Sequence, residues 1–118
     1  MRSVKSDLPE RTMKFAVRVV KLCQALDRDS PAARTLSRQL LRAGTSIGAN
    51  VEEAVAAQSK PDFISKQNIA LKEARETLYW LRLLVASDLV PEPKLTDLIQ
   101  EANELVAILT TVVRNARS

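Results

Sequence analysis

The chain has 118 residues, 46% of them apolar and 27% charged, with two glycines, one cysteine and no histidine. Its net charge of +4 is uneven, because residues 1–42 carry ten Lys or Arg against four Asp or Glu, and the remainder is slightly acidic. These numbers indicate one globular domain, and they exclude an internal disulfide and every site that depends on histidine as a base or metal ligand.

The first expected helix spans about residues 9–26. Asp7 is placed to be its N-cap, and Glu10, three residues later, to be the reciprocal partner in a capping box. A helix with two apolar faces needs more than one neighbour, and this helix has two apolar stripes. One stripe is Phe15, Val19, Leu22 and Leu26, and the other is Met13, Ala16, Val17, Val20 and Cys23.

Three more helices are expected, over about residues 31–58, 61–86 and 94–114. Ser30 and Ser59 each stand directly before a helix start and are typical N-caps. No strand pattern competes, because β-branched residues nowhere alternate with polar ones over a useful length. Four helices with short links predict an all-α protein, an antiparallel up-down-up-down four-helix bundle that takes up the whole chain as a single domain.

Several classes of site and location are not expected. No apolar run approaches the ~20 residues of a membrane span, and the N-terminus lacks an apolar signal core. The lone thiol of Cys23 fits a reducing compartment. The carboxylate pairs lack the Glu-x-x-His partners of a di-metal bundle. Glu73 and Glu76 are interleaved with Lys72 and Arg75, which indicates ion pairs on the surface of that helix. We therefore expect a cytoplasmic protein with no membrane contact, no cofactor and no metal.

Residues 44–48 read Gly-Thr-Ser-Ile-Gly, which fits the G-x-S-x-G pattern of a hydrolase nucleophile elbow. That elbow needs a strand before the serine and a base beside it, whereas both flanks here have helical periodicity and the chain has no histidine. Packing explains the motif better. Gly44 and Gly48 lie one turn apart on one helix face, where close contact with a neighbour would offset about 1 kcal/mol of helix propensity lost at each.

Ser46, Asn50 and Glu53 fall on one side of the same helix, away from the two glycines. One interpretation is a polar contact across a subunit boundary, where an asparagine can fix register. The alternative is a solvated face or an intramolecular hydrogen bond. Both interpretations favour a structural role over catalysis.

Two rows of basic residues lie in the first third of the chain. If their helices are adjacent, the rows would merge into a basic strip that contacts phosphates with salt-dependent, sequence-tolerant affinity. The alternative is ordinary exposed positions, some of them paired with Asp or Glu of another helix. Because aromatic residues are scarce, structured RNA or duplex DNA suits this surface better than a single strand. The rows are Arg11, Lys14, Arg18 and Lys21, and Arg34, Arg38 and Arg42.

Most of the chain resembles a bacterial four-helix-bundle family, the intervening-sequence proteins encoded within insertions in 23S ribosomal RNA genes and also in free-standing genes. Members of this family are similar to the accessory variability protein of diversity-generating retroelements, a homopentamer that binds nucleic acid and a reverse transcriptase. The resemblance implies a four-helix bundle, a pentamer, nucleic-acid binding and a partner that processes nucleic acid. It is carried by the segments KFAVRVVKL, QLLRAGTSIGANVEEA, SKPDFISK and EARETLYWLRLL.

Together, these patterns predict a non-enzymatic, homo-oligomeric scaffold or accessory protein that binds structured RNA or DNA through basic helix faces. The alternative is a purely protein-binding or self-assembling module, in which the second apolar faces of the first and third helices make the contacts. The residues expected to bind nucleic acid are Lys14, Arg18, Lys21, Arg34, Arg38 and Arg42.

Overall fold

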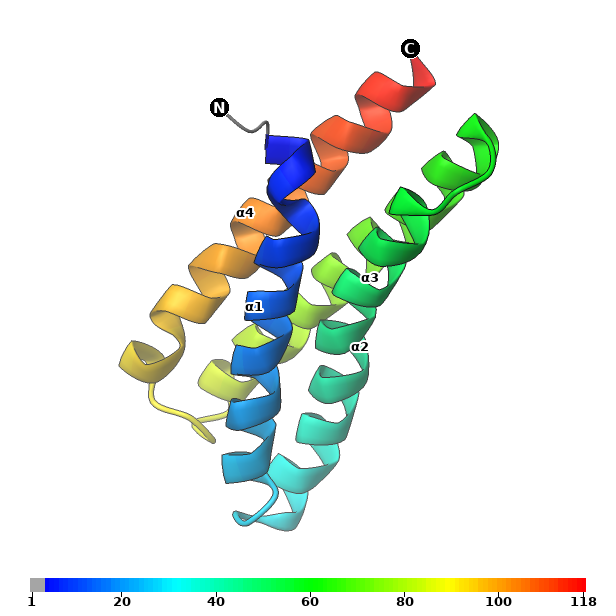
Figure 1. The fold of residues 1–118 in the computed structure, drawn as a ribbon. Coiled ribbons are helices and arrows are strands. Elements are labelled where there is room, and N and C mark those ends of the chain that lie inside the picture. The colour runs from blue at the N-terminus through cyan, green and yellow to red at the C-terminus, as the bar shows by residue number, and fades with distance from the viewer. Residues whose placement is uncertain (1–3) are drawn as a thin grey trace.

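The computed structural model describes residues 4–118, with side chains from Asp7 onward. Each helix runs antiparallel to the next, and the four form an elongated bundle with extents of 45 × 23 × 21 Å (Figure 1). Within the described range the chain forms no strand. The predicted all-α four-helix bundle is therefore confirmed. The helices are α1 (Val4–Leu26), α2 (Pro31–Val55), α3 (Lys60–Ala86) and α4 (Glu92–Arg117).

The start of α1 differs from the prediction. The helix begins at Val4, so Asp7 lies inside its first turn and the predicted capping box is wrong. Pro9 is then within the helix, where it removes one backbone hydrogen bond. Burial explains the extension, because Leu8 is 1% exposed and continues the buried stripe one turn before Thr12. Tertiary packing thus outweighs the local start signal.

The other helix ends shift by up to three residues. α2 ends at Val55 rather than near residue 58, because the chain reverses direction before Ser59, whose extended backbone starts α3. α4 begins at Glu92, directly after the extended Pro91, and continues to Arg117. These differences lie in the links and at the chain end, where a periodic pattern carries the least information.

Ser30 and Ser59 cap α2 and α3 as predicted. The Ser30 hydroxyl oxygen accepts a hydrogen bond from the backbone N–H of Ala33, and that of Ser59 accepts one from Asp62, each at 3.1 Å. Such caps contribute about 1 kcal/mol each by satisfying a backbone donor that the helix leaves unpaired. The two serine caps therefore fix where both helices begin.

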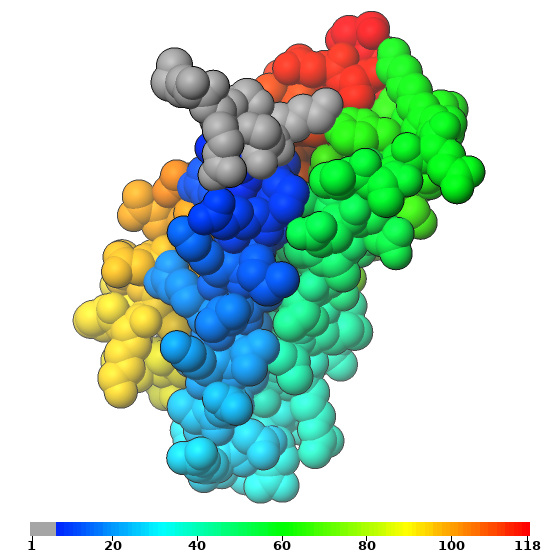
Figure 2. Space-filling model, viewed as in Figure 1, coloured from blue at the N-terminus to red at the C-terminus, as the bar shows by residue number. Residues whose placement is uncertain are grey.

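The core runs along the bundle axis and is built from one buried stripe on each helix. Figure 2 shows how α1 and α2 lie against each other along one face. The stripe of α1 that contains Phe15 is buried, whereas most of its second stripe is not. The largest fully buried side chains include Phe15, Leu40, Ile47, Leu81, Leu84, Leu95, Leu105 and Leu109.

Two glycines let α1 and α2 approach closely. A Cβ atom added at Gly44 would lie 2.8 Å from Cγ1 of Val19, which is closer than real Cβ contacts. At Gly48 the nearest atom would be the Thr12 hydroxyl oxygen, at 3.3 Å. That hydroxyl donates to the carbonyl of Leu8 at 2.8 Å, within α1. The tight contact is therefore at Gly44, and the one at Gly48 is looser.

α1 and α4 have the least extensive contact of the neighbouring helix pairs, and Arg11 bridges them. Its Nε and Nη2 donate to both carboxylate oxygens of Glu101, at 2.7 and 2.8 Å, and Nη2 also donates to Glu104 at 2.9 Å. These hydrogen bonds with Glu101 raise the pKa of Arg11 above its ordinary value, against the opposing effect of burial. Arg11 thus links α1 to α4 through its hydrogen bonds with Glu101 and Glu104.

Cys23 is buried, and its Sγ lies 3.2 Å from the carbonyl oxygen of Ser37 in α2. Burial raises the pKa of this thiol from 9.0 to about 11. The folded protein therefore keeps the thiol protonated to higher pH than the unfolded chain does.

We expect the free energy of unfolding to fall as pH rises from about 9 towards 11, since in that window the unfolded chain releases the Cys23 proton first. Below pH 9 this contribution is fully present. Urea titrations at several pH values measure it, and Cys23→Ala should flatten the slope. An equal slope in both proteins would contradict the assignment. As the chain has a single cysteine, a thiol reagent at pH 8 should label it only as fast as the protein opens.

Candidate nucleic-acid interface

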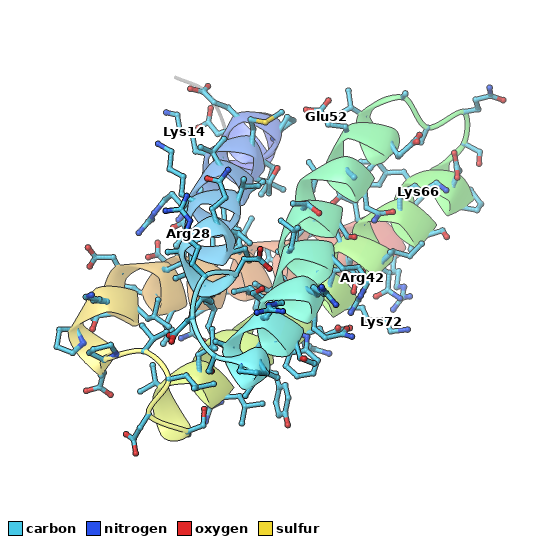
Figure 3. All side chains as sticks on the ribbon, turned by 90° about the horizontal axis from the view of Figure 1, so that it is seen from below. Lys14, Arg28, Arg42, Glu52, Lys66 and Lys72 are labelled. Carbon is cyan, nitrogen blue, oxygen red and sulfur yellow. The ribbon has the colours of Figure 1, made fainter. Side chains whose placement is uncertain are left out.

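The exposed surface of α1 is divided lengthwise into an apolar and a basic half. Val19 contacts Gly44 of α2, whereas Arg11 contacts α4. At about 100° of rotation per residue, these two contacts fix which way the other side chains of α1 from Asp7 onward face. Figure 3 shows Lys14 on the outside of α1. The half toward α4 carries Lys14, Arg18 and Lys21, and the half toward α2 carries Met13, Val17 and Val20.

The basic row on α2 is only partly available. Arg34 and Arg38 are exposed, and neither makes an ion pair with any residue for which the structure describes a side chain. Arg42 differs, because its guanidinium contacts Glu73 at 3.2 Å and also contacts Glu76, both on α3. Figure 3 shows Arg42 at the edge of α2 that faces α3. Arg42 therefore joins two helices.

An apolar patch on α1 and α2 separates the two basic rows, so they do not merge into the single strip considered from the sequence. The exposed fraction is 58% for Met13, 45% for Val17, 37% for Val20 and 38% for Leu41, which is unusually high for large apolar side chains. The rotation of α1 turns the Val20 side chain toward α2. Because Val19 lies opposite Gly44 and the two helices are antiparallel, Val20 is also near Leu41 along the bundle axis. The α1–α2 patch consists of Met13, Val17, Val20 and Leu41.

Ser46, Asn50 and Glu53 lie on α2 away from this patch. The Ser46 hydroxyl donates to the carbonyl of Arg42 at 2.6 Å, and the Asn50 amide donates to the carbonyl of Ser46 at 2.9 Å. Glu53 is exposed. Both hydrogen bonds are within one turn of the same uninterrupted helix, so the strand–turn–helix of a nucleophile elbow is absent around Ser46.

The cations of α3 were missed by the sequence reasoning, which paired Glu73 and Glu76 with Lys72 and Arg75 of the same helix. That pairing is wrong, because both carboxylates bind Arg42 instead. Arg75 is left exposed without an ion pair among the described side chains. It lines a shallow surface depression of about 390 Å³ together with Leu78, Tyr79, Arg82, Leu83 and Ala86. The spacing of Arg75, Tyr79 and Arg82, in steps of four and three residues, was the sequence signal that could have placed them on one side of α3.

Neither membrane nor metal sites emerge from the described residues. No helix in residues 4–118 is both long enough and apolar enough to cross a bilayer. Likewise, no three His, Cys, Asp or Glu of the part of the chain that the structure describes are grouped to hold a metal ion.

Comparison with known proteins identifies the family. A solved structure of a protein with unknown function from the S23 ribosomal protein family of Bacteroides thetaiotaomicron is 39% identical, covers 93% of this chain and 97% of its own, and superposes with a TM-score of 0.87. No curated protein matches the sequence. The family model described as 23S rRNA-intervening sequence protein matches residues 5–111. The chain belongs to this 23S rRNA-intervening sequence protein family.

Proposed function

We propose that this chain is a non-enzymatic, homo-oligomeric scaffold whose basic helix faces bind structured RNA or DNA. The observation that supports the proposal is the division of the α1–α2 surface: an exposed apolar patch has, on both sides, exposed cations without an ion pair among the described side chains. Apolar clusters of this kind mark contacts with other macromolecules. Lys and Arg bordering such a contact provide charge for phosphates.

The α1–α2 patch is the proposed contact between subunits. Its side chains are large and flexible or β-branched, and cations lie around it rather than within it, as at the apolar centre of a protein interface. Burying it between copies would place the basic rows beside that contact. The resemblance to the retroelement accessory protein suggests five copies, a ring of about 65 kDa built from 13.1 kDa chains.

Val17→Asp should convert the oligomer to monomers, because it places a charge at the centre of the patch, where assembly would remove it from water. Multi-angle light scattering at micromolar concentration gives the mass of each form. Ala107→Asp is the matched control, since Ala107 is exposed on α4 and outside the patch. A monomeric wild type, or equal masses for Val17→Asp and wild type, would contradict the proposed contact.

Within the two basic rows of α1 and α2, the cations proposed to bind phosphate are the four exposed ones that have no carboxylate partner among the described side chains. Lys14 is a weaker candidate, since it pairs with Glu10 on its own helix at 3.2 Å. Binding of a labelled RNA hairpin across a salt series tests the proposal, and the logarithm of affinity should fall linearly with the logarithm of salt concentration. No detectable binding at low salt would contradict it. The four are Arg18, Lys21, Arg34 and Arg38.

A second candidate is a self-assembling or protein-binding module without nucleic-acid binding. It is favoured by the ion pairs of Arg11 and Arg42, each of which is held by two glutamates and so unavailable to phosphate. Under this alternative the oligomer forms through the same patch, but the hairpin does not bind at any salt concentration. Light scattering and the salt series together separate the two candidates.

A further inference from the structure

We propose that the depression around Tyr79 on α3 is a stacking site for one unpaired base of a bound nucleic acid, with Arg75 and Arg82 contacting the phosphates beside that base. This inference deepens the proposed function and rests on nucleic acid being the ligand. It assigns a role to residues outside the basic rows of α1 and α2. It also predicts that the protein distinguishes unpaired from fully paired strands.

The three side chains share one flank of α3. Arg75 and Arg82 are seven residues apart, which is about 10 Å along a helix axis, and Tyr79 lies between them. Glu73 and Glu76 contact α2, so the helix rotation turns this flank away from α2. A second depression, of about 340 Å³, agrees with that orientation, since Arg82 lines it together with Ile99 of α4.

The Tyr79 ring is exposed and yet supported. Its side chain is 58% accessible, unusual for an aromatic residue that serves only the core. Trp80 packs against it edge to face, with ring centroids 5.1 Å apart and planes at 73°. The indole N–H of Trp80 in turn donates to Glu76 at 3.0 Å, and Glu76 is held by Arg42. Contacts from α2 through α3 thus orient a ring that still has surface available.

The charge around this ring favours a phosphate-bearing ligand. The lining of the depression contains two arginines and no carboxylate, and its remaining members are apolar or the tyrosine itself. Neither arginine makes an ion pair with any side chain that the structure describes. In the neighbouring depression, Arg82 is near Glu92 without an ion pair between them. An aromatic surface between two unpaired guanidinium groups matches a base flanked by its phosphates.

The site is separate from the proposed subunit contact. The α1–α2 patch lies on the opposite side of the bundle from the flank of α3 that faces α4, since α1 neighbours α2 and α3 neighbours α4 in the antiparallel order (Figure 1). The patch and the Tyr79 site are therefore different surfaces of the subunit. One unpaired base per subunit would add sequence-tolerant affinity to the phosphate contacts of α1 and α2.

Two RNAs with the same stem test the inference, one a hairpin with an unpaired loop and the other a blunt duplex. Wild type should prefer the hairpin by about 5- to 150-fold, the range for one stacked base. Tyr79→Leu and the Arg75→Gln/Arg82→Gln double variant should lose most of this preference while binding the duplex as before. Tyr79→Phe keeps the ring and should keep the preference.

Trp80 supplies a direct readout, because it is the single tryptophan of the chain and contacts Tyr79. Its emission should change on addition of the hairpin and not of the duplex. The exposed position of Tyr79 means that its variants should melt at the wild-type temperature, which circular dichroism checks.

The outcomes separate this inference from the proposed function. If Tyr79→Leu retains the hairpin preference while Arg34→Gln/Arg38→Gln weakens duplex binding, the stacking site is wrong and the basic faces stand. If Tyr79→Leu loses the preference and Arg34→Gln/Arg38→Gln binds the duplex normally, the stacking site is supported and the proposal that the basic faces bind phosphate is wrong. Absence of binding to both RNAs overturns both. A free mononucleotide or an acidic peptide that binds as tightly as the hairpin overturns the assignment to a strand.

Discussion

Gly44→Leu should destabilise the bundle by roughly 3 kcal/mol, at the upper end of overpacking costs in a well-packed core. Even the first added carbon would meet Cγ1 of Val19 at 2.8 Å, and Val19 is fully buried. Its β-branched side chain has few rotamers with which to yield. For a chain of this length the melting temperature should fall by roughly 10 °C or more. Thermal and urea denaturation followed by circular dichroism measure the effect.

Gly48→Ala is the matched control for steric cost. Its Cβ would lie 3.3 Å from the Thr12 hydroxyl, and the gain in helix propensity of about 1 kcal/mol should offset that mild contact. The variant should therefore be as stable as wild type or slightly more stable. The double variant Gly44→Ala/Val19→Ala should be less destabilised than the sum of its single changes, because shortening Val19 makes room. Wild-type stability of Gly44→Leu would show that the close approach of α1 and α2 is absent in solution.

Arg34→Gln/Arg38→Gln should weaken binding of duplex RNA by tenfold or more at low salt, and should reduce the slope of log affinity against log salt by about 2 for each contacting subunit. Both side chains are exposed and unpaired among the described side chains, so glutamine removes charge without breaking an internal contact. Arg42 is unsuitable for this test. Its loss would leave Glu73, whose side chain is 14% exposed, without its cation.

Arg114→Gln/Arg117→Gln is the control for net charge. It removes the same two charges from the last turn of α4, away from the proposed face. Binding should be weakened much less than in the α2 variant. Equal losses in the two variants would mean that overall charge attracts the nucleic acid and that the α2 row has no particular role.

The fold was predictable because its signals are local and repeated. Apolar periodicity and start signals indicated the helices, and the Ser30 and Ser59 caps were correct because each cap involves residues within one turn. Asp7 failed as a cap for the opposite reason. The burial of Leu8 against other helices extends α1 past it, and a single sequence does not reveal which residue meets which across the bundle.

The candidate site was harder to predict because it depends on contacts between helices. Composition placed Arg42 in a basic row, whereas packing of α2 on α3 gives it two glutamate partners. Because both glutamates pair with Arg42, Arg75 lacks the ion pair on its own helix that the sequence had predicted. Likewise, the periodicity of α1 showed two apolar stripes, but only the packed bundle determines that the stripe with Val17 remains exposed.

The limited contact between α1 and α4 has a consequence for how the chain folds. Most contacts join helices that are consecutive along the chain, so each can form after closing a link of only four or five residues between helix ends. A low relative contact order of this kind is typical of domains that fold within microseconds to milliseconds. Packing α1 onto α4 joins the first and last helices, so it closes the longest loop and also gains the fewest contacts. This contact is therefore suited to form last in folding, stabilised by the ion pair between Arg11 and Glu101.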